Sequence, residues 1–136
     1  MFLGKSPNLR ERFGEAKKGG SQMRKKNFKG RVQKRILSKS KEVVRTYDAI
    51  QYAYADVLQN CDDVVEIRCN VLLEGLEEEF TSDFVCKQKN GDWFVRECVF
   101  RKHLTKPMTV KQLDMAREYW IKRGIRNFGV VLDAEK

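Results

Sequence analysis

The stretch from Glu79 to Phe100, EFTSDFVCKQKNGDWFVRECVF, predicts a β-hairpin, and this hairpin constrains what the rest of the chain can form. Two runs rich in Phe, Val and Trp flank Asn90-Gly91, and an Asn-Gly dipeptide between such runs is the strongest short-range hairpin signal. Each predicted strand carries one acid among apolar neighbours, Asp83 in the first and Glu97 in the second. These two acids are the candidate site.

The length of the turn decides whether the two acids can meet, because strand side chains alternate between faces. A two-residue turn would place Asp83 opposite Cys98 and leave Glu97 on the other face. A three-residue loop with Gly91 in the left-handed region would place Asp83 opposite Glu97. Two carboxylates about 5 Å apart are unfavourable without a cation between them, so only the second geometry makes a metal site. In the alternative interpretation, Asp83 only begins a strand and Glu97 is solvated.

Basic residues are concentrated near the N-terminus. Residues 1–45 hold 15 Lys and Arg against 3 acids, whereas the remainder holds 13 against 16. Residues 1–40 have few aliphatic side chains and no sustained periodicity, which predicts an extended arm. Its cations suit the phosphates of nucleic acid; an arm that only solubilises or localises the protein is the alternative. The predicted nucleic-acid-binding residues are Lys17, Lys18, Arg24, Lys25, Lys26, Lys29, Arg31, Lys34 and Arg35.

The first predicted helix covers about residues 41–60, where apolar side chains recur at alternating spacings of four and three. At about 100° per residue, Gln51 lies on the flank of this apolar stripe, while Asp48 points away from it. The members of the stripe are Val43, Tyr47, Ile50, Tyr54 and Val57.

The remaining elements complete one α/β domain over residues 41–136. A strand is predicted over Val64–Leu73, and a second helix begins at a capping box formed by Thr109 and Gln112 and ends before Gly124. A last strand over Ile125–Leu132 is expected to be buried on both faces and to run parallel to the second hairpin strand. The predicted order is helix, three-stranded antiparallel meander, helix and strand.

Composition narrows the class of protein. No apolar run reaches membrane-spanning length and no signal peptide is recognisable, so we expect a cytoplasmic protein that does not associate with membranes. The four cysteines lack CxxC spacing and are expected to be structural thiols. The single histidine, His103, has no second histidine with which to form a site.

This order of elements, with Asp on the second strand and Glu on the third, resembles the PD-(D/E)xK or restriction-endonuclease-like nucleases. Within that superfamily the chain is most similar to the N-terminal catalytic domain of TnsA, the endonuclease subunit of heteromeric bacterial transposases. The resemblance covers about residues 47–133. It is carried by Cys61-Asp62-Asp63-Val64-Val65, Phe80-Thr81-Ser82-Asp83-Phe84, Asn90-Gly91, Val95-Arg96-Glu97-Cys98-Val99, Ala116-Arg117-Glu118-Tyr119-Trp120 and Gly124-Ile125.

The resemblance implies that a helix acid, Asp83 and Glu97 hold Mg²⁺ or Mn²⁺, and that a lysine two residues after the last acid helps activate water. Val99 occupies the position of that lysine. Arg101, Lys102 and Lys111 are candidate relocated cations. The position of the helix acid corresponds to Gln51, or to Asp48 in a shifted alignment.

Three functions follow as expectations. The first is a Mg²⁺-dependent endonuclease that cuts double-stranded DNA at the ends of mobile elements beside a transposase or recombinase, in the cytoplasm of a bacterial or phage-infected cell. The second is a catalytically impaired, DNA-binding subunit of the same fold. The third is a double-stranded RNA-binding module, which the closing strand and the acid pair disfavour.

Overall fold

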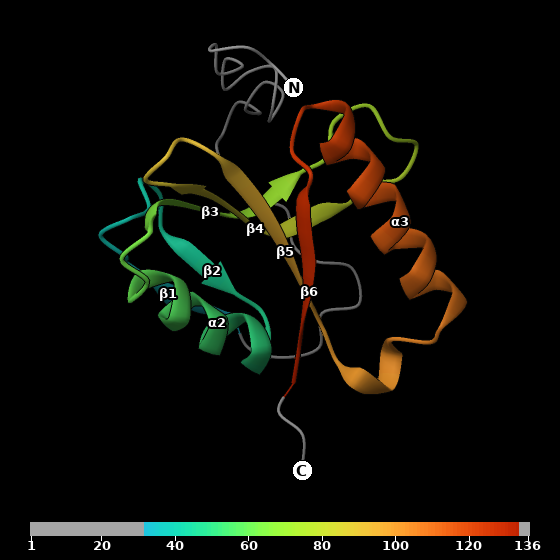
Figure 1. Ribbon diagram of the computed structural model, residues 1–136. Coiled ribbons are helices and arrows are strands. Elements are labelled where there is room, and N and C mark those ends of the chain that lie inside the picture. Colours follow the sequence, from blue (N-terminus) through green and yellow to red (C-terminus); the bar gives the residue numbers. More distant parts are fainter. Residues whose placement is uncertain (1–31, 134–136) are drawn as a thin grey trace.

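The computed structural model describes residues 32–133 as a mixed α/β domain, in which two helices lie against a four-stranded mixed sheet beside a small two-stranded hairpin (Figure 1). The expected extended arm falls mostly in residues 1–31, which lie outside the described part of the chain. The elements are β1 (Gln33–Arg35), β2 (Val44–Thr46), α2 (Ala49–Gln59), β3 (Val64–Leu72), β4 (Thr81–Gln88), β5 (Trp93–Val99), a 3₁₀ turn η1 (Arg101–His103), α3 (Pro107–Lys122) and β6 (Asn127–Leu132).

The central hairpin uses the three-residue loop. Gln88 N donates to Asp92 O at 2.8 Å, Gly91 N donates to Gln88 O at 2.9 Å, and Gly91 has φ +90°. The strands then pair in register from Lys87 with Trp93 to Phe84 with Arg96. The pairing ends at Phe84 with Arg96, and one residue further along this register Asp83 faces Glu97. Asp83 N donates to Glu97 Oε1 at 3.0 Å, so the predicted three-residue loop and the meeting of the two acids are confirmed.

The sheet has the order β3-β4-β5-β6, with β6 parallel to β5 as predicted. The predicted burial of β6 on both faces is wrong, because β6 is an edge strand and Val130 is 39% exposed. The continuous apolar run Val130-Val131-Leu132 resembles a central strand in sequence, but no strand of the described chain pairs with its outer edge.

The helix predicted from residue 41 begins only at Ala49, because Asp48 caps it by accepting a hydrogen bond from Gln51 N. Residues 44–46 instead form β2, which pairs with β1 in the segment expected to be arm. The β-branched residues of this segment favour a strand. The true apolar face of α2 is Ile50, Ala55 and Leu58, while Val57 is 58% exposed.

The second helix begins two residues before the expected capping box. Pro107 is its first residue and no side chain caps it, so the predicted role of Thr109 and Gln112 is wrong. The predicted end is confirmed: Gly124 has φ +86°, and its N–H donates to Ile121 O at 3.0 Å.

Two apolar clusters fill the two faces of the sheet, one beneath each helix. Phe84 and Cys86 of β4 pack in the cluster that contains Ile50, Ala55 and Leu58 of α2. Val85, which alternates with them, packs in the cluster that contains Trp120 of α3. The sheet is therefore covered on both sides, with the hairpin acids at the end where β4 begins and β5 ends. No helix of the described residues is long and apolar enough to cross a membrane.

Candidate active site

Asp83 and Glu97 are buried where β4 and β5 separate. Asp83 is 1% exposed and Glu97 5% exposed, so the interpretation in which Glu97 is solvated is wrong. Each carboxylate accepts a hydrogen bond from the backbone of the opposite strand. Asp83 N donates to Glu97 Oε1 at 3.0 Å, and Cys98 N donates to Asp83 Oδ2 at 2.6 Å. At this point β4 and β5 are thus joined through side-chain carboxylates.

The side-chain alternation of β4 is interrupted at Asp83. Ser82 accepts a hydrogen bond from Trp120 Nε1 on the α3 side at 2.8 Å. Asp83 instead reaches Gln51 of α2, and the next residue, Phe84, also packs on the α2 side against Tyr54, with ring centroids 5.7 Å apart. Two consecutive side chains on one face interrupt the usual alternation of a strand, although the register of β4 with β3 is the same on both sides of Asp83.

Gln51 is the α2 residue that joins the acid pair. Its side chain is 0% exposed, and its Nε2 donates to Asp83 Oδ1 at 3.0 Å and to Asn70 Oδ1 at 2.8 Å. Its Oε1 accepts from Tyr47 N at 2.8 Å. The predicted position of Gln51 beside the core is confirmed. The amide is therefore a hydrogen-bond donor to one of the two acids, Asp83, and its second hydrogen goes to the amide oxygen of Asn70.

Asp48 is placed differently from Gln51. It precedes α2, and its Oδ1 is used to cap Gln51 N at 2.8 Å. Of the two alignments considered for the helix acid, the structure therefore joins Gln51 to Asp83 and gives Asp48 a capping role.

Asn70 of β3 belongs to this polar network and was missed by the sequence analysis, which predicted a strand over residues 64–73 and gave Asn70 no role within it. It is 2% exposed, and its backbone has φ 54°. Its Nδ2 donates to Arg45 O at 2.7 Å. Asn tolerates the left-handed region better than most residues, but such conformations still store strain of about 1–3 kcal/mol and cluster at functional sites. Strand alternation alone gives no signal for this kink.

The candidate cations lie on different elements from the acids. Arg101, the first candidate, lies beyond the acid-bearing strand, because β5 ends at Val99 and Arg101 begins η1. There its N–H donates to Asp133 Oδ1 at 2.6 Å and its Nε to Asp133 O at 2.9 Å. These contacts hold the pKa of Asp133 below its usual value. Lys102 follows in η1, and Lys111 is exposed on α3.

The donor set suits a hard divalent cation in chemistry, because Asp83 and Glu97 carry carboxylate oxygens and Gln51 an amide oxygen. Within residues 32–133, however, no group of three or more His, Cys, Asp or Glu side chains could hold a metal ion. The pair is arranged as a hydrogen-bonded network: Asp83 accepts from both Gln51 and Cys98 N, and Gln51 Oε1 is used by Tyr47 N.

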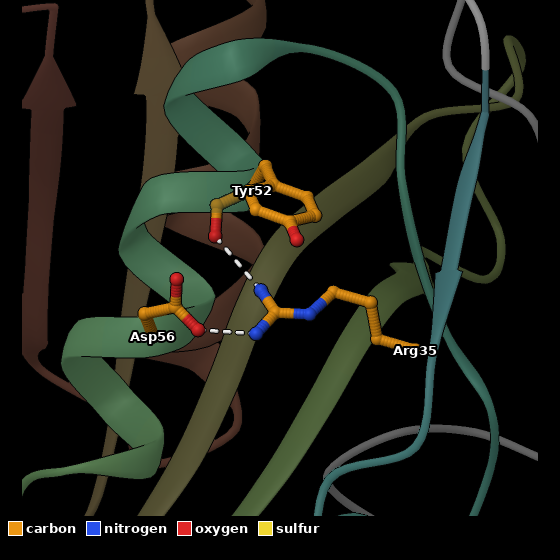
Figure 2. Close-up of polar contacts among 3 residues, drawn as sticks. All are labelled: Arg35, Tyr52 and Asp56. Atoms are coloured by element: carbon orange, nitrogen blue, oxygen red, sulfur yellow. Dashed lines mark hydrogen bonds and ion pairs between the residues drawn. The ribbon is translucent and has the colours of Figure 1, made fainter.

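Of the predicted nucleic-acid-binding residues, Lys34 and Arg35 are described, whereas Lys17, Lys18, Arg24, Lys25, Lys26, Lys29 and Arg31 lie outside the described residues. Lys34 is exposed on β1. Arg35 instead joins β1 to α2 (Figure 2): it pairs with Asp56, donates to Tyr52 O at 3.1 Å, and lies over the Tyr52 ring at 4.3 Å. Arg35 thus holds the small hairpin against the helix that carries Gln51.

The four cysteines are free thiols, as predicted. Three of them are buried in the core, and burial raises the pKa of the Cys86 thiol to about 12. A thiol with so high a pKa stays protonated near neutral pH and is a poor nucleophile there.

Comparison of the chain with protein-family models and with curated proteins finds no match.

Proposed function

We propose that this chain is a DNA strand-cleaving subunit with a restriction-endonuclease-like core, similar to the catalytic domain of TnsA and acting beside a transposase or recombinase. The observation that carries the proposal is the meeting of Asp83 and Glu97 at the separated ends of β4 and β5, with Gln51 of α2 hydrogen-bonded to Asp83. The resemblance implies this arrangement for a nuclease site: one acid on each of two adjacent strands, together with one residue of the preceding helix.

In this proposal Asp83 and Glu97 would hold Mg²⁺ or Mn²⁺, which when bound polarises the scissile phosphate and lowers the pKa of a bound water. Gln51 orients the Asp83 carboxylate through its Nε2 donor. Burial excludes bulk water from the pair, so charges there interact more strongly than at the surface. Val99 lies two residues after Glu97 on β5, at the position where the resemblance implies a lysine. Its side chain supplies neither a charge nor a hydrogen bond.

The second candidate is a non-catalytic DNA-binding subunit of the same fold. It is favoured by the neutral Gln51, which satisfies Asp83 with a hydrogen-bond donor where the related nucleases have a third acid. The double-stranded RNA-binding alternative is disfavoured by the parallel pairing of β6 with β5 and by helices that cover opposite faces of the sheet (Figure 1).

Nicking of supercoiled plasmid by the purified chain in Mg²⁺ or Mn²⁺, with and without a candidate transposase, tests the first candidate. Asp83→Asn and Glu97→Gln are matched variants, because each removes a charge at nearly constant volume. We expect nicking that both variants abolish while their thermal unfolding stays cooperative. Nicking that survives in both would reveal a contaminating nuclease. Duplex binding without nicking by the natural chain would select the second candidate.

A further inference from the structure

The connection between β5 and α3 forms an exposed basic surface directly after the acid-bearing strand. We call residues 101–111 the basic turn. Arg101, Lys102, Lys106 and Lys111 are all exposed, and the sequence contains no acid between Glu97 and Asp114. The basic turn is therefore a concentrated positive charge on a body whose sequence after residue 45 is otherwise slightly acidic.

The backbone at the start of the basic turn is closed by short-range hydrogen bonds. His103 N donates to Phe100 O at 2.9 Å, Leu104 N to Arg101 O at 3.1 Å, and Lys106 N to His103 O at 3.0 Å. Lys102 Nζ lies 5.8 Å from the centre of the Phe100 ring, and the same ring meets His103 edge-on at 6.0 Å. The lysines are thus presented by a hydrogen-bonded scaffold.

The charge of the basic turn is felt locally. The pKa of His103 is lowered below its ordinary 6.5, first by partial removal of the ring from water and second by the positive charges of Lys106 and Lys102. One carboxylate, that of Asp133, contacts the first residue of the turn and accepts its backbone N–H. The side chains of Lys102, Lys106 and Lys111 have no hydrogen bond or ion pair among the described residues.

The basic turn also lies at the same end of the sheet as the acid pair. β5 runs from Trp93 to Val99, so Glu97 and the turn share its carboxyl end, and β6 ends beside them at Leu132 (Figure 1). A duplex whose backbone contacts the lysines would therefore lie close to the end of the sheet that carries Asp83 and Glu97.

We infer that the basic turn is a phosphate-contacting surface for duplex DNA, with Lys102, Lys106 and Lys111 as the contacting residues. The choice of DNA rests on the proposed function, but the surface is a binding site whether or not the chain cleaves. It adds to the predicted basic arm a fixed contact that orients the duplex on the folded body. Phosphate contacts of this kind position the protein and carry no sequence information.

The test is duplex binding by the full chain, measured by fluorescence anisotropy with a 30-base-pair DNA over a range of NaCl concentrations. The triple variant Lys102→Gln/Lys106→Gln/Lys111→Gln is compared with Arg117→Gln/Lys122→Gln/Arg126→Gln, in which the lost charges are equal in number but lie in the second half of α3 and after it. All six side chains are exposed, so both variants should fold.

Each lost phosphate contact should reduce the slope of log K against log[salt] by about 0.9, and weaken binding by up to about eightfold at 0.1 M salt. We expect the basic-turn variant to lose about 2 to 3 units of slope and to bind at least about tenfold more weakly. The control variant should change binding by less than about twofold, because it loses charge but no contact. Equal weakening in both variants, or no loss in either, would overturn the inference.

His103 provides a second readout, because it is the only histidine in the chain. In NMR titrations, bound phosphate beside Lys102 and Lys106 should raise the pKa of His103, and the basic-turn variant should no longer show this rise with DNA. An unmoved pKa with DNA bound to the natural chain would place the contact elsewhere. Tighter binding to a duplex RNA of the same sequence would overturn the assignment to DNA. None of these outcomes depends on nicking, so failure of the cleavage proposal remains distinguishable.

Discussion

Gln51→Glu is the substitution that most sharply tests whether the acid pair is a cation site. In the natural chain Gln51 Nε2 donates to Asp83 Oδ1 at 3.0 Å and to Asn70 Oδ1 at 2.8 Å. The new carboxyl would turn both contacts into oxygen–oxygen contacts. Asn70 cannot easily reverse its amide, because its Nδ2 already donates to Arg45 O at 2.7 Å.

The expected loss can be worked from these contacts. A hydrogen bond to a charged group contributes about 1.5–3 kcal/mol and one to a neutral group about 0.5–1.5 kcal/mol, so the two together contribute about 2–4.5 kcal/mol. Two charges 3 Å apart repel by roughly 5 kcal/mol at an effective dielectric constant of 20. This repulsion exceeds the free energy of the two lost hydrogen bonds, so the new carboxyl is expected to take up a proton rather than remain charged beside Asp83.

We therefore expect Gln51→Glu to lower the free energy of unfolding by about 2–4 kcal/mol at pH 7 in EDTA. Because burial and repulsion raise the pKa of the new carboxyl in the folded state, the folded variant binds more protons than the unfolded chain. Its stability relative to the natural chain should then rise as the pH falls from 7 to 5. A cation site would also recover stability at pH 7: Mg²⁺ at 100 times its dissociation constant adds about 2.7 kcal/mol.

Urea unfolding at pH 5, 6 and 7, each with EDTA or with 10 mM MgCl₂ (about 100 times a dissociation constant of 0.1 mM), measures these effects. Gln112→Glu, the same substitution at a half-exposed position of α3, serves as the matched control and should show neither the loss nor the recovery. A variant as stable as the natural chain in EDTA would mean that Gln51 is not held against Asp83. A destabilised variant that Mg²⁺ does not stabilise would refute the cation site itself.

Three other predictions concern the core, the thiols and the repaired site. Trp120→Ala should lower the free energy of unfolding by about 3–5 kcal/mol, since Trp120 is 0% exposed. Trp120→Phe should lower it by less, although it also removes the hydrogen bond to Ser82. Nearly equal melting temperatures for Trp120→Ala and the natural chain would mean that α3 does not pack as described. In the native protein at pH 8, a thiol reagent should label Cys61 and leave Cys86 unlabelled until unfolding, with Cys61→Ser as the control. The pKa of Cys86 in the folded protein is about 12 against an ordinary 9.0, so the free energy of unfolding should fall as the pH rises between these values. Gln51→Glu/Val99→Lys should raise Mg²⁺-dependent plasmid nicking above that of the natural chain, and a folded double variant without gain would favour the non-catalytic candidate.

The hairpin was the most predictable part of the structure, because its determinants are local. Asn90-Gly91 selects a turn, and the one alternative that the residues left open was whether the loop held two or three residues. Gly91 at φ +90° resolves it in favour of three and places Asp83 in register with Glu97. The position of Gln51 was predictable for the same reason, since it depends only on the turn of one helix.

The errors lie where tertiary pairing overrides a local pattern. Tyr47 continues the apolar spacing of α2, yet residues 44–46 pair with β1, whose own three residues carry no strand pattern strong enough to recognise alone. The roles of Arg35 and Asn70 depend on contacts with Asp56 and Gln51, which lie far from them in sequence. A pairing between distant residues of this kind leaves no mark in the sequence around either partner.

The charges of the site explain why the two departures from the nuclease pattern belong together. The resemblance implies three acids and one lysine, a net charge of −2, which one divalent cation neutralises. This chain has Gln51 in place of one acid and Val99 in place of the lysine, and the remaining pair, Asp83 and Glu97, also sums to −2 when both are ionised. Restoring the acid alone leaves −3 in a buried site, and restoring the lysine alone leaves −1, which weakens the attraction for a cation. Only the double substitution returns both the third ligand and the lysine at an unchanged net charge, so the gain in nicking is expected from the pair and not from either substitution by itself.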